Sequence, residues 1–150
     1  MTLVTHHWHG YGPWAGPHQT FETKNDHVRR PGETPGDAAT VAFIRASTPP
    51  LYNGHYLLRR DQTARERTWT DIQGPLAWLA DTYAQQPPDP QLSYLDVAAR
   101  LEHTSDSLRH GSDTIWHYTA SLNGNRVVVF SVICCPHRFA TTVPCPLPPN

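Results

Sequence analysis

The sequence predicts an α+β fold in which a mainly antiparallel sheet packs with two helices. The first reason is residues 113–135, where two strand-like arms flank the dipeptide Asn123-Gly124. Asn-Gly is typical of the two-residue type I′ turn of a β-hairpin. The second reason is the order of the elements. Three strands, two helices and then the hairpin lack the βαβ alternation of a parallel sheet.

The second arm of this hairpin, residues 125–135, indicates where the core lies. Its positions are apolar on both sides, with Val127, Val129 and Ile133 on one and Val128, Phe130 and Val132 on the other. A strand with two apolar faces belongs in the middle of a sheet that is covered on both sides. A two-residue turn would place His117 opposite Phe130.

Three segments before the hairpin are expected to form a strand meander, at residues 41–47, 55–60 and 66–72. Pro75 then begins a first helix, because proline is well tolerated in a first turn, and Pro87-Pro88 ends it. A second helix is expected to begin near Ser93, which forms an S-x-x-D capping pattern with Asp96, and to end at Gly111.

Composition divides the 150 residues into three parts. Residues 1–40 are poor in aliphatic side chains and rich in His, Trp, Pro and Gly, whereas residues 136–150 are rich in proline. We therefore expect an irregular N-terminal arm at 1–40, a compact α+β domain at 41–135 and a Pro-rich tail at 136–150.

The charge of the chain and the lack of targeting signals argue against several classes of protein. A net charge of −1 and a pI near 6.8 argue against a nucleic-acid or anionic-membrane binder. Lys24 is the only lysine among 12 basic residues. This bias is typical of a GC-rich, for example actinobacterial, genome, or of selection for bidentate anion binding. The sequence shows no signal peptide or membrane span, and its cysteines are odd in number, so a cytoplasmic protein with reduced thiols is expected.

Histidines gather near the start of the chain, in the segment HHWHGYGPWAGPH. If this segment is extended, His7 and His9 project to the same side, as in an H-x-H metal pair. His18 is the candidate third ligand, and the alternatives are Glu22, Asp26 and His27. Imidazole suits Zn, Cu, Ni or Fe, so the candidate cofactor is a transition metal such as zinc. The competing interpretation is an aromatic arm that packs on the body with half-exposed histidines.

A second set of metal-ligating residues lies near the end of the chain and comprises Cys134, Cys135, His137 and Cys145. Adjacent cysteines point to opposite sides of a strand, and the C-x-x-C spacing of a zinc knuckle is missing. Two of the cysteines precede proline, and a cysteine thiolate can also ligate haem. Alternatively, one of the adjacent cysteines packs as a small apolar residue.

Two further groups suggest other chemistry. His117 lies among apolar neighbours in the hairpin and is a candidate general base, with the thiol of Cys135 as a candidate nucleophile. The alternative is a histidine that only donates to a backbone carbonyl. Four arginines around an expected turn can clamp a phosphate or carboxylate, or can form a solvated face with Asp61 and Glu66. These are Arg59, Arg60, Arg65 and Arg67.

The sequence leaves three functions open. The first is a binding or accessory protein that contacts a protein partner, or a second copy of itself, through Trp8, Tyr11 and Trp14 of the arm. The second is a small metal-assisted enzyme that uses the N-terminal histidines. The third is an anion- or nucleotide-binding domain that uses the arginines. The common phosphate-loop and hydrolase motifs are absent from the sequence.

Overall fold

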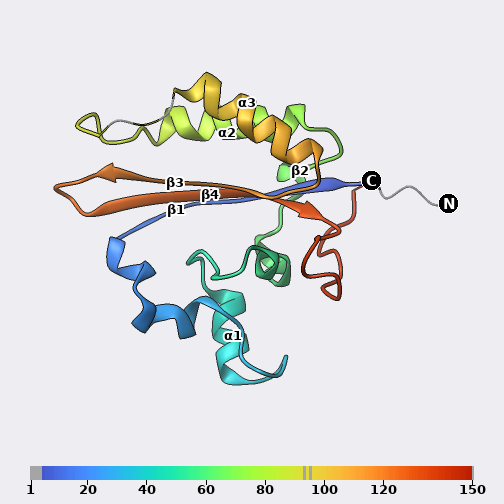
Figure 1. The fold of residues 1–150 in the computed structure, drawn as a ribbon. Helices are drawn as coiled ribbons and strands as arrows, with labels where there is room; N and C mark the ends of the chain where they lie inside the picture. Colours follow the sequence, from blue (N-terminus) through green and yellow to red (C-terminus); the bar gives the residue numbers. More distant parts are fainter. Residues whose placement is uncertain (1–4, 93, 95, 150) are drawn as a thin grey trace.

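The computed structural model describes residues 5–92, 94 and 96–149 and shows an α+β fold around a four-stranded antiparallel sheet. The strands lie in the order β2-β1-β4-β3 and comprise β1 (His7–Gly16), β2 (Thr68–Trp69), β3 (Thr114–Ser121) and β4 (Arg126–Cys135). The helices α2 (Gln73–Gln85) and α3 (Val97–Arg109) cover one face of the sheet (Figure 1). On the other face lie α1 (Ala38–Arg45) and several 3-10 helices, so the sheet is the middle of three layers.

The predicted hairpin is present as β3 and β4, and β4 is buried from Val127 to its end. Its turn differs from the prediction. Ser121 pairs with Arg126, and neither Asn123 nor Gly124 has the positive φ that a type I′ turn requires. Instead Asn125 has a φ of 50°, which closes a four-residue turn and shifts the register. As a result Trp116, and not His117, lies opposite Phe130.

The expected strand meander is wrong. Residues 41–47 fall largely within α1, and residues 55–60 fall largely within the 3-10 helix η3 (Asn53–Leu58). Of residues 66–72, Thr68 and Trp69 form β2. The helix α1 forms because Asp37 caps it, with Oδ1 accepting the Thr40 N–H at 2.8 Å. Backbone hydrogen bonds from Thr40 and Thr34 correspondingly lower the pKa of Asp37.

The segment expected to be an irregular arm contains β1, which pairs with both β2 and β4. The structure explains why this strand can contain glycines and a proline. A Cβ on Gly10 would lie 2.9 Å from the Trp69 ring, so the absence of a side chain lets that ring pack over the strand. Gly12 has a φ of +96° where the β1–β4 register shifts, and Pro13 follows at the same bulge.

Both predicted helices are confirmed. α2 carries Pro75 near its beginning, and α3 ends before Gly111, whose φ of +77° suits a C-terminal glycine. Ser93 lies outside the described residues, so the capping pattern expected there stays a prediction. Among the described helices, none combines the length and the hydrophobicity that crossing a membrane requires.

Two hydrophobic clusters pack on opposite faces of the sheet. The cluster on the helix side comprises Trp8, Leu79, Leu108, Trp116, Tyr118, Val128, Phe130, Val132 and Cys134. The cluster on the other side comprises Tyr11, Tyr56, Leu57, Ile133 and Cys135, with Val143 and Cys145 of the tail packed against it. The side chains of a strand alternate between faces, so the adjacent Cys134 and Cys135 enter different clusters.

Replacing Phe130 tests the central position of β4. Its ring is fully buried and lies 5.7–5.9 Å from the rings of Trp78, Trp116 and Tyr118. We expect Phe130→Ala to lower the free energy of unfolding by about 3–5 kcal/mol, measured by denaturant titration. Phe139 is 83% exposed, so Phe139→Ala is the control and should change stability by about 0.5 kcal/mol or less. Similar losses in the two variants would contradict the fold.

Candidate metal centre

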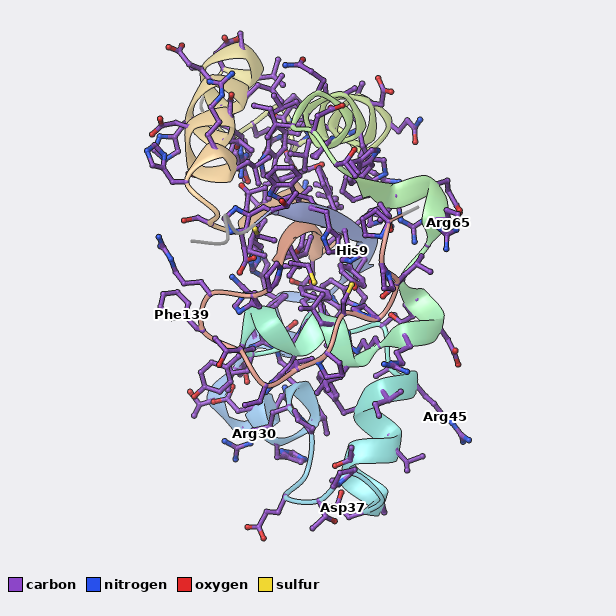
Figure 2. All side chains as sticks on the ribbon, turned by 90° about the vertical axis from the view of Figure 1, so that its right-hand side faces the viewer. His9, Arg30, Asp37, Arg45, Arg65 and Phe139 are labelled. Carbon is purple, nitrogen blue, oxygen red and sulfur yellow. The ribbon has the colours of Figure 1, made fainter. Side chains whose placement is uncertain are left out.

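Four side chains with metal-ligating atoms converge on the sheet face opposite α2 and α3. They are His7, His9, Cys135 and Cys145, and one ligand atom from each lies within 4.8 Å of the others. The Nε2 atoms of His7 and His9 lie 3.2 Å and 3.6 Å from the sulfur of Cys145. Figure 2 shows His9 deep in the molecule, with sulfur atoms beside it.

The pairing of β1 with β4 positions three of these four side chains. His7 and His9 are two residues apart on β1 and therefore point to the same side. Their imidazole rings meet edge to face with centroids 4.9 Å apart. His7 pairs directly with Cys135 across the two strands. Cys145 comes from the tail, which packs against the same face.

Two distances between ligand atoms in this group are close to those of a tetrahedral metal ion. Zn–S bonds of about 2.3 Å and Zn–N bonds of about 2.0–2.1 Å place neighbouring ligand atoms about 3.3–3.8 Å apart in a tetrahedron. The two N···S distances of 3.2 Å and 3.6 Å lie close to that interval. Two imidazoles with two thiolates form the Cys2His2 set of structural zinc sites.

Thr68 fixes the orientation and the tautomer of His9. The Thr68 hydroxyl donates its proton to the carbonyl oxygen of Ala64 at 2.8 Å. Its oxygen therefore accepts from Nδ1–H of His9, at 2.9 Å. With the proton on Nδ1, the Nε2 lone pair of His9 is free and faces Cys145. Histidines that bind metals are typically held by such a hydrogen bond from the second ring nitrogen.

Burial disfavours the charged forms of His9 and Cys135 when no ion is bound. The pKa of His9 is lowered to about 4, mainly by burial and secondly by the charge of the neighbouring His7. The pKa of Cys135 is raised to about 12, mainly by burial and secondly by its neighbour Cys145. A divalent ion would displace two thiol protons, and with two thiolates it forms a neutral unit. Neutrality removes the cost of burying a net charge at this site.

The site combines halves of two groups that the sequence presents separately. His7 and His9 come from the N-terminal histidines, and Cys135 and Cys145 come from the C-terminal set. His18 does not join them, and its Nε2 lies 3.2 Å from the Thr119 hydroxyl.

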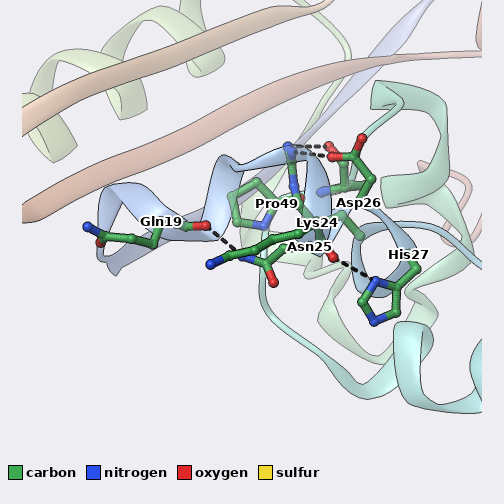
Figure 3. A network of polar contacts seen from close by, with 8 residues as sticks. Gln19, Lys24, Asn25, Asp26, His27 and Pro49 are labelled. Carbon is green, nitrogen blue, oxygen red and sulfur yellow. Dashed lines mark hydrogen bonds and ion pairs between the residues drawn. The ribbon is translucent and has the colours of Figure 1, made fainter.

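The alternative third ligands make contacts of their own in the 3-10 segment that follows β1, and Figure 3 shows those of Asp26 and His27. Glu22 pairs with Lys24 at 3.2 Å, and the ring of His27 contacts the Lys24 carbonyl oxygen at 3.1 Å. Asp26 lies 4.0 Å from the guanidinium of Arg29. These side chains do not belong to the His/Cys group.

His137, the remaining member of the C-terminal set, anchors the beginning of the tail. Its Nδ1 accepts the backbone N–H groups of Phe139 and Ala140, at 3.2 Å and 3.0 Å. The ring proton is therefore on Nε2, which donates to Asp113 at 2.6 Å. His137 and Asp113 line a pocket of about 610 Å³. Because both ring nitrogens are engaged, His137 has no free lone pair to offer a ligand there.

The structure does not bring the candidate base and nucleophile together. His117 pairs with Val129, six residues before Cys135 on β4, which corresponds to about 20 Å along a strand. The ring of His117 packs against Phe21, with centroids 4.6 Å apart. Burial is the main cause that lowers the pKa of His117, and the nearby charges of His18 and Arg29 add to it.

The four candidate arginines lie in different surroundings. Arg59 is buried and donates to the carbonyl oxygens of Phe43 and Thr48, at 3.0 Å and 2.7 Å. Arg67 donates to the carbonyl oxygen of Gly10 at 3.1 Å and so supports β1 next to the His/Cys group. Arg60 and Arg65 are exposed.

The aromatic side chains expected to contact a partner pack mainly within the protein. Trp8 and Tyr11 are buried in the two clusters on opposite faces of the sheet. Trp14 is half-buried, with its ring 5.6 Å from that of Phe21. The surface on which a partner was expected to dock is therefore largely part of the fold.

Comparisons with protein-family models, with curated proteins and with solved structures found no match. Function must therefore be argued from the geometry and chemistry of the site. The His/Cys group is the part of the described chain in which geometry, burial and ligand chemistry agree.

The tautomer of His9 is directly testable. In metal-free, reduced protein we expect long-range ¹H–¹⁵N spectra to show His9 protonated at Nδ1, because Thr68 accepts that proton. Thr68→Val removes the acceptor and should increase the Nε2-protonated form, whereas Thr68→Ser retains the hydroxyl and is the control. An Nε2-protonated His9 in the unmodified protein would contradict the assigned hydrogen bonds.

Proposed function

We propose that the protein binds one zinc ion through His7, His9, Cys135 and Cys145, and that this ion links the N-terminal strand to the C-terminal tail. The observation that carries the proposal is the convergence of four ligand atoms within 4.8 Å from segments up to 138 residues apart. Such a group does not arise from sequence proximity, so the fold has to assemble it.

The number of protein ligands favours a structural role for the ion. Structural zinc sites use four protein ligands, whereas catalytic sites use three and leave a position for water or substrate. Three of the four side chains are buried, and Cys145 is half-buried. A complete, largely enclosed ligand set leaves little room for a reacting molecule, so we favour a fold-stabilising ion over a metal-assisted enzyme.

Metal analysis with matched variants tests this proposal. Protein purified under reducing conditions without a histidine tag should contain about one zinc per chain, measured by inductively coupled plasma mass spectrometry. Cys135→Ala and His9→Ala should lose the metal. Cys134→Ala and His18→Ala are the controls and should retain it, because Cys134 faces α2 and α3 and His18 contacts Thr119.

Cobalt provides a second readout of the same ligands. Cobalt-loaded protein should show the absorption of a tetrahedral site with thiolate-to-cobalt charge transfer, and this absorption should persist in Cys134→Ala. Loss of metal from His18→Ala together with retention in Cys135→Ala would instead support the ligand set expected from the sequence. Metal-free protein that binds no zinc under reducing conditions would contradict the proposal.

Zinc should also raise thermal stability, because it binds the folded state at a site that the unfolded chain lacks. Ligand at a thousandfold excess over its Kd stabilises by about 4.1 kcal/mol. We expect a chelator to lower Tm and zinc to restore it, while magnesium, which prefers oxygen ligands, has no effect. Thr68→Val should weaken zinc affinity by about 10–100-fold through the loss of the His9 hydrogen bond, and Thr68→Ser should not. An unchanged Tm on chelation would count against a structural ion.

A further inference from the structure

The two candidate sulfur ligands are placed to react with each other. The sulfurs of Cys135 and Cys145 lie within 4.8 Å of each other. A disulfide has an S–S length of about 2.05 Å, so the sulfurs must approach by less than about 3 Å. Both cysteines are free thiols.

The tail provides the freedom for this approach. Cys135 is the last residue of β4 and is held by the sheet. Cys145 lies in the described part of the tail, residues 136–149, which has neither helix nor strand. A shift of Cys145 toward Cys135 therefore breaks no backbone ladder of the sheet.

We infer that Cys135 and Cys145 form a thiol-oxidation site, at which a peroxide converts the pair to a disulfide and thereby releases the metal ion. This inference rests on the proposed function, because the released ion is the zinc bound at the same four residues. Oxidation removes two of the four ligands, and the remaining histidine pair holds zinc far more weakly.

The chemistry balances with hydrogen peroxide as the oxidant. The Cys145 thiolate attacks a peroxide oxygen, so an S–O bond forms, the O–O bond breaks and one hydroxide leaves. The Cys135 thiolate then attacks the Cys145 sulfur, so the S–S bond forms, the S–O bond breaks and a second hydroxide leaves. Two thiolates lose one electron pair in total, the peroxide gains it, and zinc departs as the divalent ion.

Exposure assigns the order of attack. Cys145 is half-buried, whereas Cys135 and Cys134 are buried, so peroxide reaches Cys145 first. Cys134 cannot replace Cys135 as the second thiol, because its side chain lies in the cluster under α2 and α3. The structure therefore specifies one pairing out of the three that these cysteines allow.

Oxidation of metal-free and zinc-loaded protein tests this inference. Hydrogen peroxide should lower the mass of metal-free protein by about 2 Da, and peptide mapping should find a Cys135–Cys145 disulfide. Zinc-loaded protein should release about one zinc per disulfide formed, followed with a colorimetric chelator. A thiol reductant should restore the mass and the bound zinc. Cys134→Ala should behave as the unmodified protein, and Cys145→Ser should form no disulfide.

The outcomes separate this inference from the proposed function. Zinc that binds under reducing conditions, with peroxide producing only sulfinic acid or a disulfide through Cys134, would overturn the inference and leave the metal centre intact. A Cys135–Cys145 disulfide in a protein that never binds zinc would overturn both metal binding and metal release. Disulfide formation with zinc still bound would also overturn the release step.

Discussion

The pairing of β1 with β4 is the constraint on which the rest of the structure depends. It joins the beginning of the chain to the strand near its end, from His7 opposite Cys135 to Gly16 opposite Val127. β4 is apolar on both faces, and β1 covers the edge that β3 leaves open. Because side chains alternate along a strand, a slip of one residue would turn His7 and His9 toward the helices. The register of this one pairing therefore decides both the core and the candidate metal centre.

The elements that could be predicted from the sequence carry local signals, and those that could not depend on distant contacts. The hairpin, the buried β4 and the two long helices follow from turn residues and apolar periodicity. The sequence does not predict the strand β1, because Gly and Pro are depleted in strands. Here Gly10 makes room for Trp69, and Gly12 occupies a bulge, and neither reason can be read from neighbouring residues. The apolar run of α1 resembles a strand in the sequence, and the single capping residue Asp37 is a weaker local signal.

The same distinction applies to the site. All four ligands of the candidate centre could be identified from the sequence, but in two separate sets, each incomplete. Strand geometry correctly places His7 and His9 on one side and separates Cys134 from Cys135. What the sequence lacks is the β1–β4 pairing, without which His18 is the nearest available third ligand. The role of Thr68 has no sequence signal at all, since its hydroxyl becomes a partner of His9 only when β2 pairs with β1 in the fold.

The candidate centre lies on the sheet face that has less apolar packing. The sheet face under α2 and α3 is covered by the larger of the two clusters, in which two long helices supply the packing surface. The opposite face has a smaller cluster and is covered largely by 3-10 helices and the tail, which contribute few cooperative backbone hydrogen bonds. An ion that joins β1, β4 and the tail adds cohesion where apolar packing is thinnest, as metals do in domains with small cores. An oxidation that removes the ion would therefore loosen this layer first and leave the helix-covered face intact.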